Sequence, residues 1–298
     1  MSFLQARRAV RFAFTWLMAG SLWASAHAAS AQAIKQDTPD AKYSNYARTI
    51  GGEDSHDVTR ILTDQSPMAG AESLFASFFG QGVYPHFTQK ESIPKWSKMK
   101  LTIKQKFFNP AKVQAALDIL NQVTLTKMNE YANGNYDPIV RYQAMIFIGE
   151  LNQSLMTART IVPLPEALPI MGRAALNAQL PTGVRIAALL GIKRHVELGL
   201  PANRKKAVIE AMLSIVKSKE PVPGESQEGQ DWLRRRAADI LVDLGQNTPE
   251  MKEVLAMDAA VAAVPAATAV AAPSKAAATP APAKAAGSLD DLLAPPGK

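Results

Sequence analysis

Residues 51–57, Gly-Gly-Glu-Asp-Ser-His-Asp, are the one stretch of this sequence where carboxylates, a hydroxyl and an imidazole gather. Side chains of these types can share general acid–base work, so Glu53, Asp54, His56 and Asp57 are candidate residues of a hydrolytic site. Their order lacks the alternating oxygen ligands and the glycine spacing of a calcium loop. A polar surface loop is therefore the favoured interpretation, and an envelope enzyme centred on this loop is the alternative.

The rest of the sequence argues against catalysis. The 298 residues include no Cys, which excludes a thiol nucleophile and a thiolate metal site. No two of His56, His86 and His195 share a helical spacing suited to a metal, and we expect the His195 ring to bond a backbone carbonyl at the end of a helix. Neither a phosphate loop nor the common hydrolase and dinucleotide-binding motifs occur. We therefore expect a non-catalytic protein with no metal and no cofactor.

Lysine is concentrated between Lys90 and Lys106, where six Lys accompany one Glu and one Trp. Basic side chains interleaved with aromatics can bind an anionic envelope polymer or a membrane surface. The candidate contacts are Lys95, Trp96, Lys98, Lys100, Lys104 and Lys106. The alternative is that these lysines only solvate the exposed face of a helix.

The elements that must position these residues are helices. From residue 109 to residue 257 the apolar residues recur at helical intervals, and strand alternation is almost absent. The first stripe consists of Val113, Ala116, Leu117, Leu120, Val123 and Met128. A capping residue followed by proline predicts a helix start at three places: Asn109-Pro110, Asp137-Pro138 and Thr248-Pro249.

Three of the helical segments repeat one pattern, beginning at Val140, Val184 and Leu233. Each has Arg at its second position, Ala at its fifth and further apolar residues on the same helical face. The alanines are Ala144, Ala188 and Ala237, and the arginines are Arg141, Arg185 and Arg234. The arginines are 44 and 49 positions apart, and the turn-rich insert 221–226 explains the longer spacing. A period of this length, with two helices per repeat, is typical of α-solenoids.

The residues Asp137-Pro138-Ile139-Val140-Arg141, followed by Ala144, resemble the start of the second helix in the HEAT (armadillo-like) repeat family. Pro181 and Gln230 stand where the aspartate would fall in the other two segments. The resemblance implies an α-α superhelix of about three helix pairs over residues 109–257, whose groove binds a protein partner.

The recurrent arginines have two interpretations. In a stack of helices they would bond carbonyls or acids on adjacent turns, for example Asp137 or Asp231. The alternative is a basic ladder of Arg141, Arg185 and Arg234 that lines a groove for an anionic ligand.

The first 28 residues have the form of a secretory signal peptide. Three arginines precede an apolar run from Phe12 to Trp23, and Ala26-His27-Ala28 provides a small-residue cleavage site. Removal of residues 1–28 takes away three Arg and no acid, so the net charge falls from +7 to +4. Much of the basic excess is therefore a targeting signal, and no nucleic-acid partner is expected.

The opposite end, residues 258–298, is rich in Ala and Pro and is predicted to be a disordered tail. Within it, Leu289-Asp290-Asp291-Leu292-Leu293 has the composition of a short docking motif. Residues 29–108 do not repeat, and their aromatics predict a partly helical cap on the first repeat.

These features predict an exported all-α protein, located in the periplasm or secreted, with a non-repeating cap, HEAT-like repeats and a flexible tail. The expected role is a non-catalytic interaction or scaffold module of the cell envelope.

Overall fold

The computed structural model describes residues 33–64, 68–158 and 160–262. These residues form eleven α-helices and no β-strand, so the predicted all-α fold class is confirmed. The α-helices are α2 (Tyr46–Gly51), α3 (Glu53–Thr63), α4 (Ala71–Phe75), α5 (Trp96–Ile103), α6 (Gln114–Asn133), α7 (Pro138–Glu150), α8 (Ala167–Leu176), α9 (Thr182–Gly199), α10 (Ala202–Lys217), α11 (Gln227–Asp243) and α12 (Pro249–Ala262). Short 3-10 or π-helical stretches are η1 (Ala41–Tyr43), η2 (Ala76–Val83), η3 (Tyr84–Thr88), η4 (Lys90–Lys95) and η5 (Lys104–Phe108).

The chain divides into two compact units, the first of which ends at Asp258 and contains α2 to α11 and the beginning of α12. The predicted signal peptide, residues 1–28, lies outside the described residues. The predicted tail does so from residue 263 onward, while its first five residues belong to α12.

The region before α6 is built around buried aromatic rings. Phe79 is fully buried, and its ring centroid lies 4.9 to 5.8 Å from those of four other aromatic residues. These neighbours are Phe75, Phe78, Tyr84 and Phe107. Two of the four pairs, those with Phe78 and Phe107, meet edge to face, an arrangement that the ring quadrupoles favour. The core of this region thus joins α4, η2, η3 and η5.

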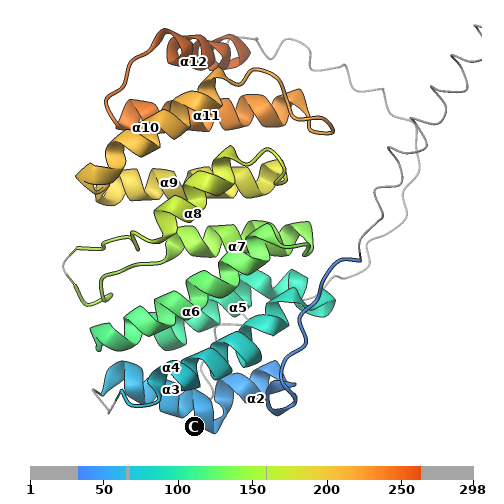
Figure 1. Cartoon of the computed structure of the whole chain (residues 1–298), viewed down its shortest axis with the longest axis vertical. Helices are drawn as coiled ribbons and strands as arrows, with labels where there is room; N and C mark the ends of the chain where they lie inside the picture. The colour runs from blue at the N-terminus through green and yellow to red at the C-terminus, as the bar shows by residue number, and fades with distance from the viewer. Residues whose placement is uncertain (1–32, 65–67, 159, 263–298) are drawn as a thin grey trace, which may run out of the picture. The chain divides into compact units, whose positions relative to one another are not determined.

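After this region the helices pack in succession, α6 with α7, α8 with α9 and α10 with α11 (Figure 1). Helix α9 also packs directly against both α7 and α11. Where α7 meets α9, Gly149 and Gly191 allow the two backbones to touch. A Cβ placed on Gly149 would lie 2.8 Å from the Gly191 Cα, a distance that real side chains do not adopt. Glycine at these two positions therefore sets the close approach of the helices.

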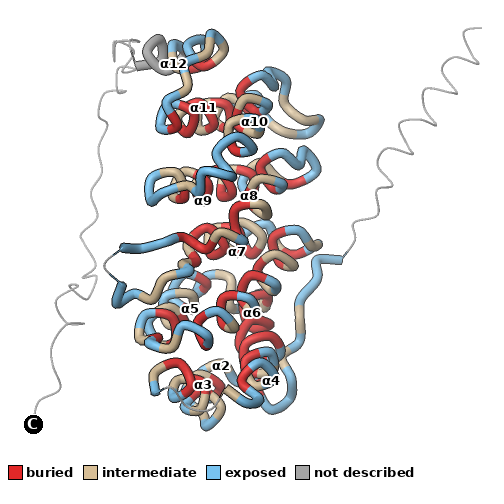
Figure 2. Tube along the Cα trace, turned by 60° about the vertical axis from the view of Figure 1, so that its left-hand side comes forward, coloured by how far each residue is buried: buried red, intermediate tan, exposed pale blue. Residues whose placement is uncertain are grey.

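The buried residues lie along the faces where these helices meet (Figure 2). Ala144, Ala188 and Ala237, the repeated alanines, are all fully buried, on α7, α9 and α11 respectively. Their small side chains let neighbouring helices approach closely. The repeated alanine of the sequence is therefore a packing residue.

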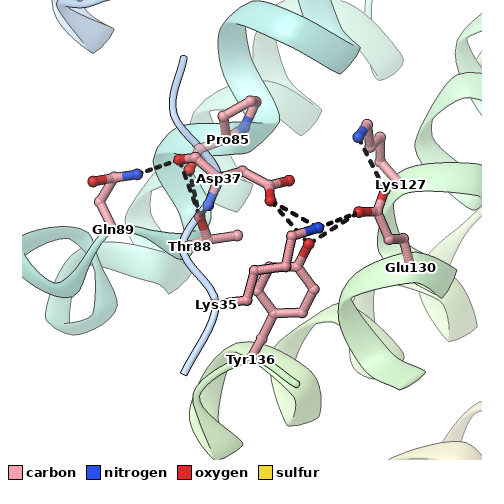
Figure 3. Close-up of polar contacts among 8 residues, drawn as sticks. All are labelled: Lys35, Asp37, Pro85, Thr88, Gln89, Lys127, Glu130 and Tyr136. Carbon is pink, nitrogen blue, oxygen red and sulfur yellow. Dashed lines mark hydrogen bonds and ion pairs between the residues drawn. The ribbon is translucent and has the colours of Figure 1, made fainter. Parts of the chain in front are cut away.

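An N-terminal segment, residues 33–40, runs beside the end of α6 and beside η3 (Figure 3). Lys35 Nζ lies 3.0 Å from Glu130 Oε1 and 3.2 Å from Asp37 Oδ1. The Tyr136 hydroxyl lies 3.0 Å from carboxylate oxygens of both acids. On the other side of the segment, the Asp37 amide donates to Thr88 Oγ1 at 2.8 Å. The segment thereby links the aromatic region to the first helix pair.

Glu130 is charged because of this network. Burial alone would raise the pKa of its carboxyl, but hydrogen bonds from Lys127, Lys35 and Tyr136 outweigh burial and hold the pKa at about 2. Its contribution to folding is consequently present at neutral pH and lost only in acid.

Two local predictions are wrong. Asn109-Pro110 does not start a helix, because α6 begins at Gln114, after Lys112 and Val113 have donated backbone hydrogen bonds to the Leu62 carbonyl. Residues 53–57 are not a loop but the first turns of α3. Acids at a helix N-terminus interact favourably with the helix dipole, which explains the acidic composition of this stretch.

Candidate binding cleft between α5 and α7

The predicted lysine-rich site is divided by the fold into three parts. Lys90, Lys95 and Lys98 are exposed, whereas Lys100 and Lys104 turn toward α7, where both contact Glu150. Lys106 bonds the Ile50 carbonyl, and burial lowers the pKa of its ammonium group. The six lysines therefore do not form one continuous basic surface.

Trp96 is not a surface contact, which corrects its assignment as a binding residue. Its side chain is 1% exposed, and its ring meets those of Phe87 and Phe147 at centroid distances of 4.6 and 6.3 Å. Since Trp96 is the first residue of α5, these contacts anchor that helix against η3 and α7.

A cleft of about 630 Å³ is lined mainly by residues of α5, η5, α6, α7, the loop after α7, and α9. Its apolar lining includes Phe108, Leu117 and Phe147, all of which are buried. Its polar lining includes Lys100, Lys104, Glu150, Asn152 and Arg194. We refer to this hollow as the α5–α7 cleft.

Two lysines in the cleft hold one carboxylate. Lys100 Nζ lies 2.8 Å from Glu150 Oε1, and Lys104 Nζ lies 3.1 Å from Oε2. Burial alone would raise the pKa of Glu150, but the hydrogen bond from Lys100 and the charges of both lysines outweigh burial and lower it. Glu150 is therefore ionised at neutral pH, with one ammonium on each of its oxygens.

Arg194 supplies a third cation from α9. Its guanidinium donates to the Gly149 carbonyl at 3.0 Å and to the Asn152 side-chain oxygen. Burial lowers its pKa and the charge of Glu150 opposes that shift, yet an arginine stays protonated under physiological conditions. Among the lining residues that the structure describes, three cations thus face a single acid, a net charge of +2.

Three large apolar side chains in the lining are open to solvent. Leu101 is 53% exposed, Met156 44% and Ile161 38%. Leu101 belongs to α5, whereas Met156 and Ile161 belong to the loop between α7 and α8. Clustered exposed apolar side chains mark interaction sites, whereas single ones need no explanation. Three such side chains gather around the α5–α7 cleft, which marks it as a candidate interaction site.

The recurrent arginines lie elsewhere and are structural. Each donates its Nε–H to the carbonyl of the next-to-last residue of the preceding helix: Arg141 to Ala132 at 3.2 Å, Arg185 to Ala175 at 3.1 Å and Arg234 to Val216 at 3.0 Å. They satisfy carbonyls that a helix end otherwise leaves without a partner.

Two of these arginines are unavailable to a ligand, since Arg185 is 6% and Arg234 3% exposed. The alternative of a basic ladder along a groove therefore does not fit. Of the two acids proposed as their partners, Asp231 lies 3.6 Å from Arg234. Asp137 instead accepts from the Ile139 amide as the N-cap of α7, so the predicted helix start there is confirmed.

The other predicted site, the acid–base cluster of residues 53–57, is not assembled by the fold. Glu53 and His56 are exposed on α3. Asp54 contacts the Tyr43 hydroxyl and lies 2.6 Å from Lys42 Nζ, and Asp57 lies 3.1 Å from Arg60. Both aspartates are thus paired with local partners. Within the described ranges, no group of three or more His, Cys, Asp or Glu is placed to hold a metal ion.

His195 is buried within α9, and its Nε2 has no hydrogen-bond partner. Nε2 therefore does not make the bond to a backbone carbonyl that was expected of this ring. Burial, with the charge of Arg194 added, lowers the pKa of His195 to about 4. The ring is accordingly neutral at physiological pH, like the Leu residues that hold the corresponding position in the other repeats.

Glu150 and Arg194 were missed in the sequence, although a signal for them exists. Both lie ten positions after the first residue of their repeat, and Asp243 holds the same position in the third. A charged residue at one repeat position places charges on neighbouring helices.

No family model, characterised protein or solved structure matches this chain. No helix among the described residues is both long and apolar enough to cross a membrane.

Proposed function

We propose that this chain is a non-catalytic binding module in which HEAT-like helix pairs form a solenoid that presents the α5–α7 cleft to a protein partner. The observation that carries the proposal is the joint presence of three exposed apolar side chains and three cations around one hollow. Protein interfaces combine such apolar centres with polar groups that fix orientation. The stacked pairs supply a rigid frame, because each pair packs against its neighbours.

The solenoid assignment is supported by equivalent contacts in successive pairs. The same alanine is buried and the same arginine bonds the same carbonyl position in each pair. A chance set of amphipathic helices would share the apolar stripe but not this hydrogen bond.

The partner is tested by chemical cross-linking in native cells, followed by identification of the attached protein. Leu101→Asp places a charge among the exposed apolar side chains at the rim of the cleft, which are Leu101, Met156 and Ile161. Val242→Asp is the matched control, since Val242 is 50% exposed on α11 and does not line the cleft. We expect a discrete adduct with the unmodified chain and with Val242→Asp, and its loss with Leu101→Asp. Equal adducts from all three chains would refute the assignment of this cleft.

We also propose that the chain is exported and cleaved after Ala28. The basic residues, the apolar run and the small-residue site within residues 1–28 support this. Since the chain has no Cys, burial rather than disulfides would then stabilise the exported fold. The test is the intact mass of the protein recovered from the envelope fraction. A chain that keeps its first 28 residues in the cytoplasm would contradict the proposal.

A further inference from the structure

We propose that the α5–α7 cleft recognises a partner segment in which a carboxylate stands beside leucine-sized apolar side chains, and that this carboxylate competes with Glu150 for Lys100 and Lys104. This inference rests on the proposed function and specifies the chemistry of its partner.

The charge of the cleft selects an acid. Three cations and one carboxylate line the cleft, so an added acid is attracted and an added base repelled. Lys100 and Lys104 are 14% and 31% exposed in their side chains, which leaves their charges less screened than those on the open surface.

The geometry of the lysines selects a carboxylate. Each ammonium bonds a different oxygen of Glu150, at 2.8 and 3.1 Å, so the pair already holds a group of this shape. Glu150 is 31% exposed and stands at the last residue of α7. It can therefore leave the lysines for solvent when another carboxylate takes its place, without unwinding a helix.

The apolar rim selects the neighbours of that acid. Leu101 comes from α5, on the same helix as Lys100, while Met156 and Ile161 come from the loop after α7. Methionine adapts its shape to the group it contacts. An acid and two or more leucine-sized side chains, spaced along a short segment, would contact both the lysines and this rim.

The test measures binding of a labelled peptide to the full chain by fluorescence anisotropy. The probe is Ser-Leu-Asp-Asp-Leu-Leu-Ala, a sequence that has the required chemistry and also occurs at residues 288–294 of the chain. The matched control peptide replaces both Asp by Asn and keeps the apolar residues. Vesicles of anionic phospholipid and free dodecanoate serve as the lipid probes.

Four variants separate the contributions. Glu150→Gln removes the competing carboxylate and is expected to tighten binding of the acidic peptide about three- to tenfold, with no effect on the Asn peptide. Lys104→Met is expected to weaken it roughly tenfold, whereas Lys98→Met should change nothing, because Lys98 is an exposed lysine of the adjoining α5 that does not line the cleft. Leu101→Asp should abolish binding of both peptides.

Equal affinity for the two peptides, or weaker binding after Glu150→Gln, would overturn the inference. So would saturable binding of vesicles or dodecanoate in place of the peptide. If Leu101→Asp still removes the cellular adduct while the peptides are not distinguished, the proposed function stands and this inference fails. If Val242→Asp removes the adduct equally, the proposed function fails with it.

Discussion

The aromatic region before α6 and the helix pairs after it solve the same packing problem by different means. The first joins short helices through large rings that come from four elements around Phe79. The second repeats a small residue and a carbonyl-bonding arginine on α7, α9 and α11. The first depends on a few large buried side chains, whereas the second distributes its stability over equivalent contacts.

The α5–α7 cleft lies where these two regions meet. Its lysines come from α5 and η5 in the aromatic region, while Glu150 and Arg194 come from α7 and α9. The cleft thus combines side chains of the aromatic region with side chains of the packed helices that follow it.

The largest expected effect concerns the ring cluster. Phe79→Ala should destabilise the chain by about 3–5 kcal/mol, the range for a fully buried aromatic truncated to alanine, measured by urea unfolding. Leu101→Ala, in the same region but exposed, is the control and should change stability by less than about 0.5 kcal/mol. Equal effects of the two substitutions would show that the rings are not the core of this region.

The next effect concerns acid stability of the helix pairs. The pKa of His195 is lowered to about 4 from an ordinary value near 6.5, so the folded chain binds fewer protons than the unfolded chain between these values. Its stabilising contribution is complete above pH 6.5 and is lost as the pH falls toward 4, by up to about 3 kcal/mol.

His195→Leu should remove this pH dependence, because Leu holds the same position in the neighbouring repeats. The measurement is the free energy of unfolding between pH 7 and pH 4. A variant that loses stability in parallel with the unmodified chain over that range would show that other groups are responsible.

Close contact of α7 with α9 predicts a smaller effect. Gly191→Ala should cost about 1–3 kcal/mol because the new Cβ meets the backbone of Gly149 and the Met171 side chain. Gly172→Ala, in α8, has open space around its Cβ and should be neutral or stabilising, since Ala favours helix. Thermal unfolding of both variants would show whether helix propensity or packing decides at position 191.

The smallest effect concerns the N-terminal segment. Glu130, with its pKa lowered from 4.5 to about 2, contributes stability above pH 4.5 that is lost as the pH falls toward 2. Because these side chains are partly exposed, Lys35→Met should lower the unfolding temperature at pH 7 by less than about 4 °C. Lys112, an exposed lysine before α6, provides the control variant Lys112→Met. An equal fall in unfolding temperature with this variant would show that the Lys35 network does not stabilise the fold.

Local signals in the sequence predicted helices within residues 109–257 but did not predict the cleft. Asp137-Pro138 predicted the start of α7, since a cap and a proline act within one turn. The same signal failed at Asn109, where bonds to Leu62 hold the chain in a turn until Gln114. Trp96 was misplaced because lysines around it in sequence do not reveal which side of α5 is packed.

The cleft itself depends on distant partners. Lys100 and Glu150 are separated by 50 residues, and Arg194 follows Glu150 in the next repeat. Only the register of the repeats relates Glu150 to Arg194, and nothing in the sequence relates either of them to the non-repeating α5.

The most direct test of the cleft as the binding site is a photo-cross-linking scan in native cells. A photoreactive residue is placed at the exposed apolar positions that line the cleft, Leu101, Met156 and Ile161, and at exposed apolar positions that do not line it, Ile139, Leu176 and Val242. The account predicts an adduct with one partner protein from the first three positions and none from the others. Adducts of equal yield from the second set would contradict it.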